Sequence, residues 1–123
     1  MNILIDNKSG VPIYDQIYSQ IKSQIINGSL NEDDMLPSIR GLAKDLRISF
    51  ITTKRAYEEL EKEGLIRSVA GKGFYVCEYN TDYLREKQLM MIEERFGEII
   101  DDCKKAGLTV EDVVEMVETL YKE

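Results

Sequence analysis

The chain contains 123 residues, of which 43% are hydrophobic, and carries a formal net charge of -7; this length fits one ordinary domain, or a small domain with an appendage. It has no histidine, the commonest general base and metal ligand, and its two cysteines, Cys77 and Cys103, are too few for a disulfide scaffold and are interpreted as small packed hydrophobes. Because no serine or cysteine occupies a recognisable nucleophile setting either, we expect no enzyme activity, no metal site and no cofactor.

The first predicted helix spans about residues 12 to 27. Pro12 suits a first helical turn, isoleucine recurs at every fourth position from Ile17 to Ile25, and Gly28 follows the end of the pattern. The next segment, SLNEDDMLP, is polar and ends in proline, so we interpret it as a loop.

Two short helices joined by a tight turn are predicted next. Ser38 caps the first of them, residues 47 to 49 form the turn, Ser49 caps the second, and Gly64 ends it. The inward-facing positions of the two helices are Leu42, Ala43, Leu46, Ala56, Tyr57 and Leu60. Helices this close in sequence cross at a steep angle, which leaves the second free to enter a groove of duplex DNA.

A glycine-tipped hairpin completes this region. Residues 65 to 69 and 74 to 78 are strand candidates, and between them Gly71 and Gly73 flank Lys72 at the tip. The predicted fold class is therefore mainly α (α+β): an N-terminal winged helix-turn-helix with a small β-hairpin wing.

The remaining residues predict a two-helix tail. Asn80 and Thr81 open a long helix that Gly107 ends, and Thr109 caps a last helix. Apolar residues lie near one face of each helix: Leu84, Ile92, Phe96, Ile99 and Cys103 in the first, and Val110, Val113, Val114, Val117, Leu120 and Tyr121 in the second. Two helices bury such faces poorly alone, so we expect a second copy of the chain to cover them.

The charge is distributed unevenly along the chain. Residues 1 to 78 hold 10 basic and 11 acidic side chains, whereas residues 79 to 123 hold 6 and 12. Residues 38 to 77 hold 8 basic and 5 acidic side chains, so the predicted helix-turn-helix and wing are locally basic. We therefore divide the chain into a DNA-binding domain, residues 1 to 78, and a dimerisation tail, residues 79 to 123.

The ordered motif LPS-x-R-x-LA, a capped helix, RAY-x-x-L-x-x-EGLI and G-x-G resembles the GntR family of transcriptional regulators over roughly residues 10 to 78. The opening helix PIYDQIYSQIKSQI and the short helical tail are similar to its YtrA-like subfamily. We expect a homodimeric repressor that binds a near-palindromic operator in double-stranded DNA. The resemblance implies control of neighbouring genes, often transporter operons.

The resemblance also implies which residues contact DNA. Arg40 is expected to bind the backbone or a base, and the tip of the wing is expected to enter the minor groove. The recognition helix is expected to present polar contacts. Phe50 is added to them because of its apolar side chain, not because of the resemblance, as an apolar contact with a base. The expected DNA-binding residues are Arg40, Ser49, Phe50, Thr52, Lys54, Arg55, Gly71 and Lys72.

Several positions depart from the family pattern. Gly41 stands where the family commonly has glutamate, so the capping box of Ser38 is incomplete. Phe50 and Ile51 replace polar or basic residues, so we expect base reading at these two positions to use apolar contact, for example with a thymine methyl group. Asp33 stands where relatives usually place glycine. A purely structural alternative for Arg40 is an ion pair with Glu58.

The alternative function is a winged-helix module that binds protein rather than DNA through its Ile and Val faces, with Arg40, Lys54 and Lys72 dispensable. No apolar run approaches the roughly 20 residues that span a bilayer, and the start lacks the layout of a signal peptide, so we expect a cytoplasmic protein without a membrane partner. The tail offers little volume for a ligand pocket, and whether a small-molecule effector binds between protomers stays open.

Overall fold

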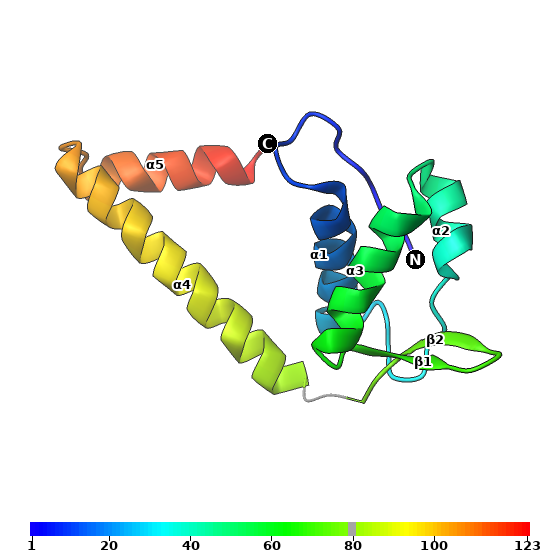
Figure 1. The fold of residues 1–123 in the computed structure, drawn as a ribbon. Coiled ribbons are helices and arrows are strands. Elements are labelled where there is room, and N and C mark those ends of the chain that lie inside the picture. The colour runs from blue at the N-terminus through cyan, green and yellow to red at the C-terminus, as the bar shows by residue number, and fades with distance from the viewer. Residues whose placement is uncertain (79–80) are drawn as a thin grey trace. The chain divides into compact units, whose positions relative to one another are not determined.

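The computed structural model describes residues 1–78 and 81–123, which fall into two units (Figure 1). Unit 1, Met1–Thr81, contains three helices and a two-stranded antiparallel hairpin, and unit 2, Asp82–Glu123, contains two helices. The predicted fold class, a winged helix-turn-helix followed by a helical tail, is confirmed.

Helix α1, Ile13–Ile26, begins after Pro12 and buries its isoleucine face against the third helix. Its fully buried positions include Ile17, Ile21 and Ile25, as the spacing predicts. At its far end, Tyr18 donates a hydrogen bond to the carboxylate of Glu63, and Lys22 Nζ lies 3.1 Å from the same carboxylate. This polar cluster ties α1 to the end of the third helix.

The helix-turn-helix consists of α2, Ile39–Leu46, and α3, Phe50–Lys62, and α3 packs against both α1 and α2 (Figure 1). Each helix begins at its predicted cap: Ser38 Oγ accepts a hydrogen bond from the Gly41 N–H at 2.9 Å, and Ser49 Oγ accepts one from the Thr52 N–H at 3.0 Å. Because Gly41 has no side chain to return the bond, the capping box at α2 is incomplete, as expected.

Tyr57 lies at the centre of the unit 1 core. Its ring meets that of Phe74 edge-on, with 5.0 Å between centroids, and its hydroxyl donates a hydrogen bond to the carbonyl oxygen of Pro37 at 2.6 Å. Burial raises the pKa of this phenol. One side chain therefore joins α3, the hairpin and the segment that enters α2.

Tyr57→Phe is expected to lower the free energy of unfolding at neutral pH by about 1 kcal/mol, because it removes one buried hydrogen bond. The raised pKa means that folding favours the neutral phenol, so this stabilisation is complete below the usual phenol pKa near 10 and is lost as pH rises above it. Urea unfolding at pH 7 and pH 11 should therefore show a smaller alkaline loss in Tyr57→Phe than in wild type. The exposed Tyr121 provides the matched control, and an equal alkaline loss in Tyr57→Phe and Tyr121→Phe would contradict the assignment.

The wing consists of β1, Ile66–Val69, and β2, Gly73–Val76, in antiparallel register with Ile66 opposite Val76 and Val69 opposite Gly73. Residues 33 to 36 run along the other edge of β2: the Asp33 N–H donates to the Val76 carbonyl and the Leu36 N–H donates to the Phe74 carbonyl, both at 2.9 Å. The segment interpreted as a loop therefore pairs with β2 like a short third strand, and Met35 and Tyr75 form an isolated β-bridge.

The backbone conformation and the ion pair of Asp33 show why aspartate can replace glycine at this position. Its φ of 67° lies in the left-handed region, where glycine is favoured and aspartate is tolerated. Its carboxylate lies 2.7 Å from the guanidinium of Arg67, which also donates to the Val76 carbonyl at 3.0 Å. The aspartate thus keeps the backbone geometry and adds an ion pair to the wing.

Helix α4, Thr81–Lys105, begins at the last residue of unit 1 and otherwise belongs to unit 2, which also contains α5, Val110–Tyr121. Asn80, predicted to open this helix with Thr81, lies outside the described residues. The turn between the helices contains Gly107 with a φ of 78°. Thr109 and Asp112 form a complete capping box for α5, and the hydrogen bonds from Thr109 lower the pKa of Asp112.

Most apolar side chains of unit 2 are exposed in the single chain. Helices α4 and α5 diverge from the turn as an open V, so each leaves its apolar face largely uncovered (Figure 1). We call the following residues the apolar face of unit 2: Ile92, Phe96, Ile99, Val110, Val114, Leu120 and Tyr121. Cys103, close to the turn, is buried. Within the described part of the chain, no helix is long and apolar enough to cross a membrane.

Candidate nucleic-acid interface

The first turn of α3 is fixed by its cap. Ser49 Oγ accepts from the Thr52 N–H and donates to Thr52 Oγ1 at 2.7 Å. A hydroxyl that accepts a hydrogen bond keeps its own hydrogen to donate. Of these two predicted contact residues, Ser49 is engaged in the cap, and Thr52 has a hydroxyl hydrogen available for an acceptor outside the protein.

The buried and exposed faces of α3 are sharply separated. Its buried positions are Thr53, Ala56, Tyr57 and Leu60. On the opposite face Lys54 is exposed, and its Nζ lies 3.9 Å from Glu58 Oε1, a loose ion pair one turn apart. Lys54 is therefore held on the surface of α3 by a weak contact that another anion can replace.

Arg55 is placed differently from Lys54. The centre of its guanidinium lies 3.8 Å from the centroid of the Tyr14 ring on α1, a cation–π contact. The residue remains exposed. A guanidinium that lies over a ring keeps its N–H groups as donors, so Arg55 can still bind an acceptor. The sequence motif gave no indication of this packing role.

Arg40 is exposed on the first turn of α2. Among the described residues the alternative ion pair between Arg40 and Glu58 does not form, since Glu58 lies beside Lys54. The arginine therefore has no acidic partner in the described part of the chain that would explain it as a structural residue.

The tip of the wing presents a lysine. Lys72 is exposed between Gly71 and Gly73, whose φ angles are 75° and 126°. Its N–H donates to the Val69 carbonyl at 3.0 Å, which closes the turn. Positive φ at both glycines turns the chain back sharply, so the lysine side chain stands at the end of the hairpin.

Several acidic residues in α3 and directly after it have partners within unit 1. Glu63 binds Tyr18 and Lys22, Glu61 accepts a hydrogen bond from the Ser68 N–H at 3.2 Å, and Glu58 lies near Lys54. Within the described residues, no group of three or more acidic, cysteine or histidine side chains is placed to hold a metal ion.

Three helices with a helix-turn-helix and a two-stranded wing define a winged helix-turn-helix protein. The family model for bacterial regulatory proteins of the gntR family matches residues 13–76. The chain is 36% identical over 118 residues to the HTH-type transcriptional repressor YtrA of Bacillus subtilis, covering 96% of this chain and 91% of that protein. The chain therefore belongs to the gntR family of bacterial regulatory proteins.

Solved structures agree with this assignment. A GntR family transcriptional regulator from Listeria monocytogenes superposes with a TM-score of 0.71 at 30% identity, covering 94% of this chain and 98% of that one. The AraR DBD in complex with operator ORX1 superposes with a TM-score of 0.55 at 28% identity, covering 63% of this chain and 96% of that one. The resemblance to YtrA is confirmed, and so is the prediction of a DNA-binding transcriptional regulator rather than an enzyme.

Proposed function

We propose that this protein is a homodimeric repressor that binds a near-palindromic operator in double-stranded DNA and controls neighbouring genes. Each protomer places α3 in a major groove, and the two α3 helices enter successive major grooves about 34 Å apart. The wing of each protomer reaches the adjacent minor groove. Unit 2 holds the two protomers together.

The observation that carries this proposal is the division of α3 into a buried face and a face that carries Lys54 in a weak, replaceable ion pair. Arg40 on α2 and Lys72 on the wing add exposed cations on the two elements that flank α3 in sequence. Cations of this kind bind phosphate oxygens, fix the register of the protein on the duplex and supply most of the affinity. The operator-bound AraR DBD supports the same use of this fold.

The hydroxyls and backbone of the same elements supplement the cations. Thr52 can donate its hydroxyl hydrogen to a phosphate near the N-terminus of α3, where the helix dipole also favours an anion. Ser49 acts mainly by holding Thr52 and the first turn in place. Arg55, which lies over the ring of Tyr14, offers its guanidinium as a further donor.

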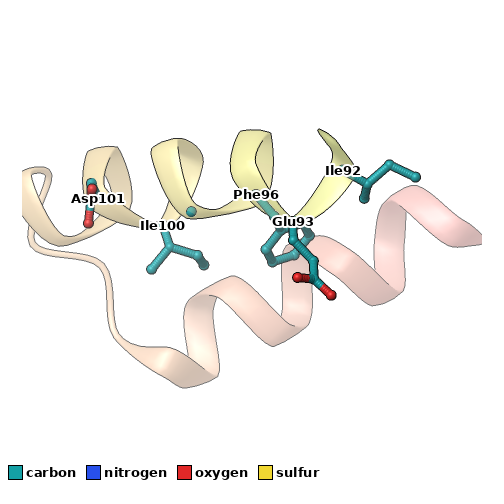
Figure 2. Close-up of a pocket in the computed structure, with 6 residues that line it drawn as sticks. Ile92, Glu93, Phe96, Ile100 and Asp101 are labelled. Carbon is teal, nitrogen blue, oxygen red and sulfur yellow. The ribbon is translucent and has the colours of Figure 1, made fainter. Parts of the chain in front are cut away.

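The exposed apolar face of unit 2 supports the homodimer. Val110 is 75% and Tyr121 is 88% exposed in the single chain, although both belong to the apolar side of an amphipathic helix. On α4, an open hollow of about 610 Å³ is lined by the apolar side chains of Ile92, Phe96 and Ile100 and by the carboxylates of Glu93 and Asp101 (Figure 2). Gly97 also lines this hollow, so a second backbone can approach closely there.

Electrophoretic mobility shift against the gene's own upstream region tests the proposal. Arg40→Ala and Lys72→Ala are each expected to weaken binding by about 100-fold, because each removes one charge-assisted contact of about 1.5 kcal/mol from both half-sites. Both residues are exposed, so neither change should alter the fold.

Lys105→Ala removes an exposed cation from unit 2 and is the matched control, expected to bind like wild type at moderate salt. Equal binding by wild type, Arg40→Ala and Lys72→Ala would refute the site. Absence of binding by wild type to any selected fragment would favour the alternative, a winged-helix module that binds protein.

A further inference from the structure

Helix α3 begins with two large apolar side chains that its core does not use. Phe50 is 48% and Ile51 is 77% exposed, whereas the core of unit 1 takes its α3 contacts from Thr53, Ala56 and Tyr57. Single exposed apolar residues are common and need no explanation by themselves. The exposure of Ile51 points to a function because of the residues beside it on α3.

Ile51 shares its face of α3 with two cations. Residues three and four positions apart are neighbours on a helix surface, so Ile51 lies beside Lys54 and Arg55. In the part of the chain that the structure describes, Lys54 is engaged only by the loose contact with Glu58, and the exposed Arg55 lies over the ring of Tyr14. The exposed surface of α3 thus combines one apolar side chain with two positive charges. Such a surface complements a negatively charged polymer that also carries small apolar groups.

Duplex DNA presents one such group on the edges of its bases in the major groove. Among the four bases only thymine has a methyl group there, at C5, and apolar side chains contact it. A β-branched side chain has one strongly preferred rotamer in a helix, so Ile51 is held in a defined direction before binding. The hydrogen bond between Ser49 and Thr52 fixes the turn from which it projects.

We propose that Ile51 is a specificity-determining residue that reads the C5-methyl group of a thymine in each half-site of the operator. The assignment rests on the proposed function, because it requires α3 to lie in the major groove. Phe50, adjacent in sequence and less exposed, projects from a different side of α3 and is not needed for this contact. Lys54 and Arg55 bind the backbone around it and confer no preference for thymine.

A double-mutant cycle between protein and DNA tests this assignment. The operator is first obtained by selection of bound genomic fragments, and each thymine is then replaced by deoxyuridine, which removes only the methyl group. For wild type, one symmetric pair of replacements should weaken binding by about 15-fold, or about fourfold per half-site, the effect of one buried methyl group. Ile51→Ala should bind the thymine and deoxyuridine operators equally.

Leu4→Ala provides the matched control, because Leu4 is also an exposed aliphatic side chain of unit 1, and this variant should keep the full preference for thymine. Thermal unfolding should show that Ile51→Ala folds like wild type. Operator binding by wild type that is insensitive to every deoxyuridine replacement overturns the inference and leaves the proposed function standing. Preference lost in Phe50→Ala but kept in Ile51→Ala also overturns it, whereas failure of wild type to bind DNA refutes the proposed function itself.

Discussion

The single change Leu120→Asp is expected to convert the homodimer into monomers, with the dimer dissociation constant raised by about 10²- to 10⁴-fold. Leu120 is 65% exposed in the single chain and belongs to the apolar face of unit 2. Burying a leucine stabilises an interface by about 1.5–3 kcal/mol, and a symmetric dimer loses two copies. A carboxylate left in an apolar interface adds a desolvation penalty.

Sedimentation equilibrium measures the loss of dimer, and mobility shift with a full operator and with a half-site measures its consequence. Two linked half-sites gain about 10²- to 10⁴-fold over one, so Leu120→Asp should bind the full operator about as weakly as the half-site. Thr119→Asp introduces the same charge at the neighbouring exposed position on the polar side of α5 and should remain dimeric. If Leu120→Asp also sediments as a dimer, the interface lies elsewhere.

The parts of this fold that the sequence predicted are those decided within a few residues. Ser38, Ser49 and Thr109 cap helices because each hydroxyl reaches a backbone N–H three residues later. The Gly71 and Gly73 turn is equally local, since their positive φ angles suit a tight hairpin. Local geometry of this kind can be predicted from short sequence patterns, and these predictions were correct.

The parts that the sequence did not predict depend on residues far apart in the chain. Residues 33 to 36 pair with the wing because β2, about 40 positions later, has backbone groups that β1 does not bind. Nothing in a polar segment such as SLNEDDMLP indicates this partner. The long-range ion pair between Asp33 and Arg67 was missed for the same reason.

The candidate site shows the same division. The motif predicted that Arg40, Lys54 and Lys72 lie at the surface, and all three are exposed in the structure. Their roles in binding DNA stay predictions. The motif did not show that Arg55 lies over the ring of Tyr14, because this contact depends on how α1 and α3 pack. The sequence predicted apolar base reading at Phe50 and Ile51 without separating the two, whereas the greater exposure of Ile51, beside two cations, selects it for the test.

Replacing Arg40, Lys54 and Lys72 together is expected to cause the largest change in operator binding, and the change should appear in its salt dependence. If Arg40, Lys54 and Lys72 of both protomers each neutralise one phosphate, these six contacts contribute about -5 to the slope of log K against log salt, which is about 10³-fold between 50 and 200 mM salt. Replacing all three residues with glutamine removes these contacts without removing the core of unit 1. The triple variant should therefore bind weakly, with a slope of only about -2 from the remaining Arg55 contacts.

A matched triple variant separates local contacts from total charge. Lys87, Lys105 and Lys122 are exposed in unit 2 and at the C-terminal end, and replacing them with glutamine changes the net charge of the chain by the same amount. Because the proposed phosphate contacts are made by α2, α3 and the wing, this control should keep a slope near that of wild type. Fluorescence anisotropy over a range of salt concentrations measures all three slopes. Identical slopes for the two triple variants would show that overall charge, rather than the surface formed by α2, α3 and the wing, governs binding.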